Sequence, residues 1–281
     1  MIFEKIINFD SNFQYKQISK TKKATDIYLV EDKKVNQNTK KYILKINHQK
    51  NKEEYNLIIN TIKLLNKNKY PTPKLLHSKY INSKSYFIFE YIKGNPIKQE
   101  SKNIIPISNL IKEFYNITKN TPINSNLTLQ EKVKNFKLNI STPIYKKIFY
   151  DILTQIIQNI QNEKLRIIDI NTSNFINIEN QLYIIDFDEI FFTEIEFDIA
   201  DLFTDFVKIH KDSFFEIIKY YNLFLNEFKE YDINNEKIIN YMILILISEL
   251  TNNAPKEENT WKMQAIHFLF TNKNTFLKYL K

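Results

Sequence analysis

The chain has no cysteine, a single glycine and a single arginine among its 281 residues. Because cysteine is absent, a disulfide bond, a thiolate metal site and a cysteine nucleophile are all excluded. Gly94 and Arg166 stand alone, while lysine, isoleucine and asparagine are abundant, a bias that an AT-rich genome explains. Motifs that depend on glycine or arginine can therefore be altered in this chain without loss of the fold.

The chain also lacks a long apolar run. The longest one, residues 241–247, is far shorter than the roughly 20 residues that a membrane-spanning helix needs. The first residues, MIFEKIINFD, carry acidic side chains where a signal peptide needs a continuous apolar segment. We therefore expect a soluble, cytoplasmic protein without a membrane partner, and the missing cysteine agrees with a reducing compartment.

Charge is distributed unevenly in a composition that is otherwise ordinary for a globular protein. Residues 1–150 contain 28 lysines and 11 acidic residues, a net charge of +17. Residues 151–281 contain 12 basic and 21 acidic residues, a net charge of −9. The basic half could attract a polyanion such as a nucleoside triphosphate or RNA, and the acidic half cations or metal ions. Solvated surface lysines are the alternative explanation.

The first part of the chain alternates short strand-like segments with one helical segment. Three β-branched or aromatic segments bounded by polar breaks predict strands over residues 13–19, 26–32 and 41–47. Apolar spacing predicts a helix over 52–68, which the prolines of YPTP end. Two apolar runs, 74–81 and 85–92, then predict a hairpin.

After Gly94 the apolar periodicity is mostly helical. It predicts helices near residues 106–118, 143–162, 212–229, 234–251 and 259–280. The strand-like pieces recognised in this half are 175–178 and 182–186. The sequence therefore predicts an α+β fold with a small mixed lobe over residues 1–93 and a larger, mainly helical lobe over residues 94–281.

The stretch from Asp169 to Asp186 has the spacing of a phosphotransferase site. It reads DINTSNFINIENQLYIID, in which Asn174 follows Asp169 by five positions and a strand ends in Asp186. Phosphoryl transfer to a hydroxyl needs a carboxylate that orients the incoming oxygen and accepts its proton, together with oxygen ligands for Mg²⁺. Asp169 suits the first role. Asn174 and Asp186 suit the second, because a hairpin between them would bring them together. Each residue alone could equally be a helix cap or a turn residue.

Lys45 lies within an apolar strand, YILKIN. A lysine in this position is costly unless it meets an anion, and nucleotide phosphates would supply one. Glu54 shares the apolar face of the following helix and is the candidate partner of Lys45, with Glu53 as the competing choice. A strand lysine that extends to solvent is the alternative.

The segment FIFEYIKGNPI, residues 87–97, has the pattern of a connector between two lobes. Backbone groups at Glu90, Tyr91 and Ile92 could bond the edge of a purine. Gly94, at the bend, indicates either a backbone conformation that other residues resist or a simple turn. Further along, Asp198 precedes an apolar helical run and could cap that helix.

At these residues the chain resembles the aminoglycoside phosphotransferase and choline kinase group. The resemblance rests on YILKIN, the glutamate-bearing helix, FEYIKG, DINTSN, IIDFDEI and FDIADL, and covers roughly residues 13–205. It implies a protein-kinase-like fold of two lobes, the first of which binds nucleotide. The second carries the catalytic loop and the acceptor site.

The resemblance also implies a role for each candidate residue. Asp169 is the catalytic base, and Asn174 and Asp186 bind Mg²⁺. Lys45 binds the phosphates of ATP or GTP with Glu54 as its partner. The residues of the connector, Glu90, Tyr91 and Ile92, form the purine-binding hinge.

Three positions depart from the pattern of this group. Ile167 stands where the group has a histidine two residues before the catalytic aspartate. Asn171 and Thr172 stand where the group often has His-Pro, and the loop SKTKKATD, residues 19–26, contains no glycine. These departures leave open a divergent acceptor or a reduced activity.

We expect a small-molecule kinase that transfers the γ-phosphate of ATP or GTP to a hydroxyl of a small, cationic acceptor resembling an aminoglycoside, choline or an amino alcohol. Carboxylates suit a polyamine, and aromatic rings suit choline through cation–π contact. The candidate residues are Asp212, Glu216, Tyr220, Tyr221, Glu227, Asp232, Glu236, Tyr241, Glu249, Glu257, Glu258 and Trp261.

Two other classes of function remain as alternatives. A pseudokinase or nucleotide-binding module would keep the fold without turnover, which Ile167 and the glycine-free loop favour. A basic nucleic-acid-binding protein would bind RNA with strong salt dependence. The division of charge between the two halves of the chain argues against the nucleic-acid partner.

Overall fold

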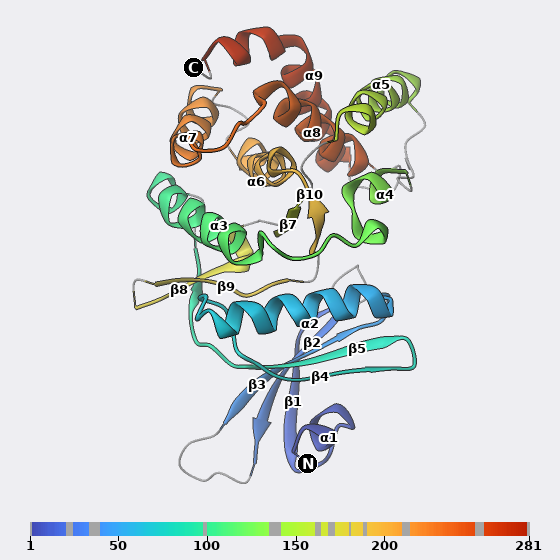
Figure 1. Cartoon of the computed structure of the whole chain (residues 1–281), viewed down its shortest axis with the longest axis vertical. Helices are drawn as coiled ribbons and strands as arrows, with labels where there is room; N and C mark the ends of the chain where they lie inside the picture. Colours follow the sequence, from blue (N-terminus) through green and yellow to red (C-terminus); the bar gives the residue numbers. More distant parts are fainter. Residues whose placement is uncertain are drawn as a thin grey trace. The chain divides into compact units, whose positions relative to one another are not determined.

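The computed structural model describes residues 2–20, 25–33, 40–97, 100–134, 142–160, 164–167, 172–179, 181–187, 190–209, 214–250 and 256–279. The chain divides into two compact units (Figure 1). The first consists of Met1–Pro96 and Phe175–Asp188, and the second of Ile97–Asn174 and Glu189–Lys281. The segment that carries Asp186 therefore groups with the first unit, although it follows much of the second along the chain.

The first unit is built on a five-stranded antiparallel sheet with the order β1-β2-β3-β5-β4. The strands are β1 (Phe13–Lys20), β2 (Thr25–Asp32), β3 (Lys41–Asn47), β4 (Leu75–Ile81) and β5 (Lys84–Glu90). Helices α1 (Ile2–Ile7) and α2 (Lys52–Lys67) lie on opposite faces of this sheet (Figure 1).

The two faces of β3 have different partners. Leu44 and Ile46 belong to the apolar cluster that β3 forms with α1. Because successive side chains of a strand alternate, Lys45 points to the opposite face. Its neighbour across the β3–β5 ladder is Phe87, whose ring centroid lies 5.6 Å from that of Tyr55 on α2. Lys45 is therefore on the face of the sheet that α2 covers.

A second, smaller sheet completes the first unit. It has three strands in the order β6-β8-β9. They are β6 (Asn95–Pro96), β8 (Phe175–Ile178) and β9 (Gln181–Ile184). β8 and β9 form the antiparallel hairpin that the sequence predicts. β6 is the end of the connector after β5, so the connector and the hairpin are joined by strand pairing.

The second unit is mainly helical. Its α-helices are α3 (Ile104–Thr118), α4 (Leu129–Lys134), α5 (Pro143–Asn159), α6 (Ile195–Ile209), α7 (Phe214–Glu227), α8 (Asn235–Ser248) and α9 (Lys256–Tyr279). Short 3₁₀ helices are η1 (Ser101–Asn103), η2 (Ser125–Leu127) and η3 (Thr172–Asn174). Strands β7 (Lys164–Ile167) and β10 (Ile190–Thr193) pair antiparallel.

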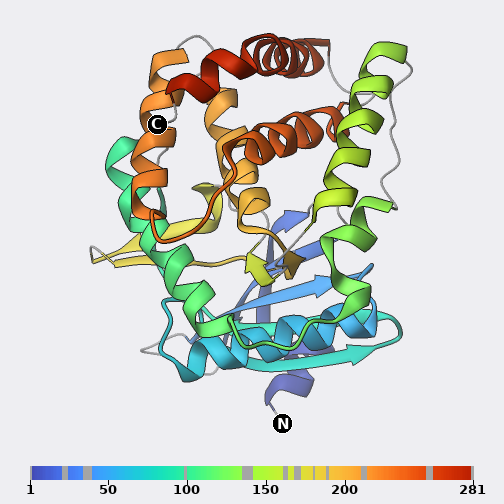
Figure 2. The same ribbon diagram turned by 45° about the horizontal axis from the view of Figure 1, so that its top comes forward.

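Helix α8 is the centre of the second unit. It is apolar on nearly every side, and most of its residues from Ile238 to Ile247 are buried. A helix with this composition is stable only when neighbours surround it. Helices α5, α6 and α9 provide these neighbours (Figure 2). Among the helices that the structure describes, none combines the length and apolar character needed to cross a membrane.

The expected fold class is confirmed: the chain combines an antiparallel sheet with one long helix in the first unit and a mainly helical second unit. The sequence pattern does not indicate α1, α4, β7 or β10. The two strands have four residues each, and their pairing of Lys164 with Thr193 joins segments far apart in the chain. Such non-local pairing leaves little local signal.

Candidate functional site

Lys45 makes a buried ion pair with Asp186. The Lys45 Nζ lies 2.8 Å from Asp186 Oδ1. The Lys45 side chain is 7% exposed and that of Asp186 27%, so the carboxylate is the partner that reaches solvent. A nearly buried ammonium is stable only beside negative charge. The structure thus brings together two of the site residues that the sequence predicts.

Asp186 is held by the hairpin that precedes it. Ile184, the last residue of β9, is buried, and its N–H donates to the carbonyl of Pro71 at 3.1 Å. Phe187, directly after Asp186, is also buried. Anchors on both sides of Asp186 therefore belong to the first unit, which is the unit that carries Lys45.

The connector lies unusually close to β8 at Gly94. A Cβ atom at this position would be 3.1 Å from the carbonyl oxygen of Asn177, 3.1 Å from Cγ1 of Ile178 and 3.2 Å from Cδ1 of Ile176. Gly94 does not have a positive φ. The expectation of a special backbone conformation is therefore wrong. The physical reason for glycine here is the close approach of another strand.

The carboxylate of Glu54 contacts the start of its own helix. Its Oε2 accepts the N–H of Asn51 at 3.1 Å, while the Asn51 side chain accepts the N–H of Glu54 at 2.9 Å. This reciprocal arrangement is a capping box, which satisfies two backbone donors at the first turn of α2. The Glu54 Oε1 lies 3.6 Å from Lys50 Nζ. In this structure the carboxylate beside Lys45 is thus that of Asp186, in place of the expected Glu54.

The predicted hinge follows the end of β5. Glu90 pairs with Lys74 twice: its N–H donates to the Lys74 carbonyl at 3.0 Å, and its Oε1 accepts the Lys74 N–H at 2.8 Å. Tyr91 is 39% exposed, with the Lys41 ammonium 6.0 Å from its ring centroid. Residues 91–94, including Ile92, belong to no strand or helix, so the ladder of β5 does not use their backbone groups.

The other predicted site residues lie next to segments that the structure does not describe. Asp169 itself is outside the described residues, as is Asn171. Asn174 ends η3 and is followed directly by β8. Ile167, the departure from the histidine of the similar group, ends β7 and is paired with Ile190 of β10.

Asp198 does not cap a helix as the sequence suggested, because α6 already begins at Ile195. The Asp198 side chain is 1% exposed, and its Oδ2 accepts a hydrogen bond from the hydroxyl of Tyr115 on α3. Asp198 therefore links α6 to α3 inside the second unit.

The candidate acceptor residues are mostly engaged with other groups. Tyr220, Tyr221 and Tyr241 are buried, so they belong to the core rather than to a cation-binding surface. Three of the carboxylates form ion pairs: Glu216 with Lys219, Glu236 with Lys273, and Glu249 with Lys262. Trp261 has the Lys262 ammonium 5.8 Å from its ring centroid. Asp212 and the side chains of Glu257 and Glu258 are outside the described part of the chain.

A buried network that the sequence does not reveal ties β10 and α6 to α8. The Lys237 Nζ donates to Glu194 at 2.6 Å and to the carbonyl of Asn159 at 2.6 Å. The Tyr241 hydroxyl donates to the second Glu194 oxygen at 2.7 Å. Next to it, burial raises the pKa of the Glu196 carboxyl above its ordinary value, although that carboxyl accepts the N–H of Asn234 at 3.1 Å.

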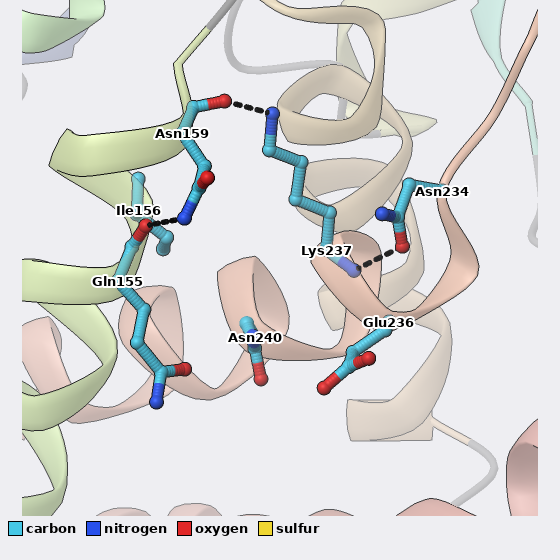
Figure 3. A pocket seen from close by; sticks show the side chains of 7 residues that line it. All are labelled: Gln155, Ile156, Asn159, Asn234, Glu236, Lys237 and Asn240. Carbon is cyan, nitrogen blue, oxygen red and sulfur yellow. Dashed lines mark hydrogen bonds between the residues drawn. The ribbon is translucent and has the colours of Figure 1, made fainter.

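A polar cavity of about 550 Å³ lies beside this network, between the end of α5 and the start of α8 (Figure 3). Its lining residues are Gln155, Ile156, Asn159, Asn234, Glu236, Lys237 and Asn240. Its charges are already neutralised, since Lys237 pairs with Glu194 and Glu236 with Lys273. None of the predicted nucleotide or metal residues lines it.

Among the described residues, no group of three or more histidine, aspartate and glutamate side chains gathers as a metal site would require. A site for Mg²⁺ between protein and nucleotide does not need one, because Mg²⁺ commonly takes one or two protein carboxylates and completes its shell with phosphate oxygens and water. Carboxylate and amide oxygens, the groups that Asp186 and Asn174 carry, are ligand types that Mg²⁺ accepts.

No protein family model matches the chain. A curated relative, "Protein LicA homolog" from Mycoplasma capricolum subsp. capricolum, is 24% identical over 206 residues, which are 70% of this chain and 79% of the relative.

Solved structures show a clear likeness of fold. The amicoumacin kinase hAmiN, in complex with AMP-PNP, Ca²⁺ and Ami, aligns with a TM-score of 0.69 at 12% identity over 96% of this chain and 93% of its own. Aminoglycoside phosphotransferase APH(4)-Ia, as a thermostable mutant with AMP-PNP and hygromycin B, gives 0.66 at 12% identity over 95% and 97%. Choline kinase from Cryptosporidium parvum gives 0.63 at 12% identity over 96% and 91%. The predicted resemblance is confirmed at the level of the fold, which is that of these kinases.

Proposed function

We propose that this protein is a small-molecule kinase that transfers the γ-phosphate of ATP or GTP to a hydroxyl group of a small, cationic acceptor. The observation that carries the proposal is the 2.8 Å contact between Lys45 and Asp186, two residues of the predicted nucleotide and metal site that lie far apart in the chain. The likeness to aminoglycoside, amicoumacin and choline kinases supports it, since those proteins share the fold.

In this proposal Lys45 and the hinge hold the nucleotide. The Lys45 ammonium binds the α- and β-phosphates. Because Lys45 is buried, the negative charge of these phosphates stabilises its ammonium group. Backbone groups at Glu90, Tyr91 and Ile92 bond the edge of the purine, because the strand ladder ends at Glu90.

Asp186 and Asn174 are the proposed metal ligands. Phe175 pairs with Ile184 across the hairpin. By chain connectivity, Asn174 before this pair and Asp186 after it therefore leave the hairpin at the same end. When bound, Mg²⁺ neutralises charge on the phosphates during transfer. Neither ligand accepts the proton of the acceptor hydroxyl, which is the role of a third residue.

Asp169 is the proposed general base. Its carboxylate orients the acceptor hydroxyl and accepts its proton as the new oxygen–phosphorus bond forms. At the same time the bond between the γ-phosphorus and the bridging oxygen breaks, and the nucleoside diphosphate leaves with that electron pair. The acceptor class follows from the acidic second half of the chain, which favours a cationic molecule.

The test is a phosphate-transfer panel with ATP and GTP, in the presence of Mg²⁺, against aminoglycosides, choline, ethanolamine, homoserine and sugars. We expect transfer to at least one cationic acceptor, and we expect Asp169→Asn to lower kcat by roughly 10²- to 10⁴-fold. Thermal stability and binding of AMP-PNP are expected to stay unchanged in that variant. Asp151→Asn, the same substitution at an exposed position of α5, is the control.

A pseudokinase is the alternative outcome of the same experiment. Tight, Mg²⁺-dependent binding of AMP-PNP without transfer to any acceptor would favour it, and so would an Asp169→Asn variant indistinguishable from wild type. The departure at Ile167 is the feature of the chain that this outcome would explain.

A further inference from the structure

The connector and the hairpin approach each other at Gly94 more closely than a side chain normally allows. All three atoms within about 3.2 Å of a Cβ built on Gly94 belong to β8: a backbone oxygen of Asn177 and side-chain carbons of Ile176 and Ile178. Gly94 does not have a positive φ, so an alanine at this position would not strain the backbone. The only cost of a methyl group is the contact with β8.

β8 cannot yield to such a contact independently of its neighbours. It is the middle strand of the small sheet, paired on one side with Asn95 and Pro96 of β6 and on the other with β9. A push at Asn177 is therefore passed across the ladder to β9, since Asn177 faces Leu182. Asp186 follows β9 after a single intervening residue, Ile185.

The far side of the hairpin is held against the first unit as well. The N–H of Ile184 bonds the carbonyl of Pro71, which follows α2, and the carboxylate of Asp186 bonds Lys45. The hairpin is thus fixed at the connector, at Pro71 and at β3. Of these three contacts, the one at the connector can be changed by adding a single methyl group to Gly94. Such a group would displace the neighbouring atoms by a few tenths of an ångström.

We propose that Gly94 is a positioning residue for metal-dependent nucleotide binding: its missing side chain lets the connector hold the β8–β9 hairpin, and with it Asp186, at the correct distance from Lys45. This inference rests on the proposed function. It adds a link from the hinge to the metal ligand, so that the segment next to the purine site also sets the position of the group that meets the metal.

The experiment measures binding of AMP-PNP to the full chain as a function of Mg²⁺ concentration, by calorimetry, for wild type, Gly94→Ala and Gly94→Val. Loss of a group that orients a metal ligand costs about 10- to 100-fold in metal affinity. Gly94→Ala displaces its neighbours by only a few tenths of an ångström, so we expect a smaller rise, roughly 3- to 10-fold, in the half-saturating Mg²⁺ concentration. Gly94→Val is expected to raise it further. Lys93→Ala, at the neighbouring exposed position, is the control and keeps the wild-type value.

A thermal melt separates positioning from simple packing. If Gly94→Ala melts at a lower temperature but keeps the wild-type Mg²⁺ dependence, Gly94 serves packing alone and the inference is overturned. Should Gly94→Ala not fold, the double variant Gly94→Ala/Ile178→Ala, which removes one of the contacting carbons, takes its place and is expected to return toward wild type.

The outcomes for the two proposals are distinct. Wild-type protein that binds AMP-PNP with Mg²⁺ but transfers no phosphate contradicts the kinase proposal and still allows the Gly94 measurement. If the affinity of the wild-type protein for AMP-PNP does not depend on the Mg²⁺ concentration, the Gly94 inference is overturned, whatever the activity of the protein.

Discussion

Breaking the ion pair between Lys45 and Asp186 is expected to reduce the stability of the protein strongly. At 2.8 Å, two unit charges attract each other by about 6 kcal/mol at an effective dielectric constant of 20. Removing the ammonium from water offsets much of this attraction, because the Lys45 side chain is 7% exposed. Loss of either partner removes this attraction while the other charge still carries its desolvation cost, so we expect a loss of about 3 kcal/mol.

A double-mutant cycle measures this coupling directly. Lys45→Met and Asp186→Asn keep approximate side-chain shape, and urea unfolding gives the free energy of unfolding for both single variants and for the double variant. We expect the double variant to lose about as much as either single one, which is a coupling energy of about 2 to 3 kcal/mol. Strictly additive losses would refute the reasoning, because they would mean that the two side chains do not interact in solution.

An exposed ion pair on the same sheet provides a matched control for the cycle. Lys41 and Glu31 also form an ion pair on this sheet, at 2.6 Å, but their side chains are 40% and 30% exposed. Solvent and salt screen such a pair, so its coupling should be much smaller than that of Lys45 with Asp186 and should fall further as salt is added. Equal coupling in the two cycles would show that burial is not the deciding factor.

Two further predictions concern the second unit. Lys237→Met removes the ammonium that donates to the buried Glu194 carboxylate at 2.6 Å, so we expect a loss of about 3 kcal/mol in urea unfolding, whereas Lys219→Met, at an exposed pair, should cost much less. Little or no loss in Lys237→Met would contradict the network. Burial raises the folded-state pKa of Glu196, so the folded protein holds this proton more tightly than the unfolded chain, and stability falls as the pH rises from the ordinary glutamate value through the raised one. Glu196→Gln, which keeps an acceptor for the Asn234 N–H, should therefore be more stable than wild type at neutral pH and lose this advantage in acid, as followed by melting temperature against pH; an advantage that does not change with pH would count against this assignment.

The sequence predicted the five strands of the main sheet and helix α2 closely because each depends on a local pattern. The expected strand over 41–47 is β3, and the expected helix over 52–68 is α2 with its end one residue earlier. The partner of Lys45 was predicted less well. Asn51 followed three residues later by Glu54 is a capping-box spacing that the sequence already contains, and it explains why Glu54 lies at the start of α2.

The candidate site was only partly accessible to sequence reasoning. The spacing of Asn174 and Asp186 around a hairpin could be read, since β8 and β9 are short apolar runs joined by a turn. The network of Glu194, Lys237 and Tyr241 could not, because charged residues on separate elements carry no signal of their pairing.

By itself the sequence determined the strands of the main sheet and the longer helices, the absence of thiol chemistry and the residue types available for phosphoryl transfer, because these depend on composition and short-range pattern. The tertiary structure decided which carboxylate meets Lys45. That residue is 141 positions away, and it arrives there because a hairpin from the later part of the chain pairs with the connector and packs in the first unit. Gly94 shows the same division: its rarity was visible in the sequence, but only the structure shows that β8 approaches this position closely enough to disfavour a side chain.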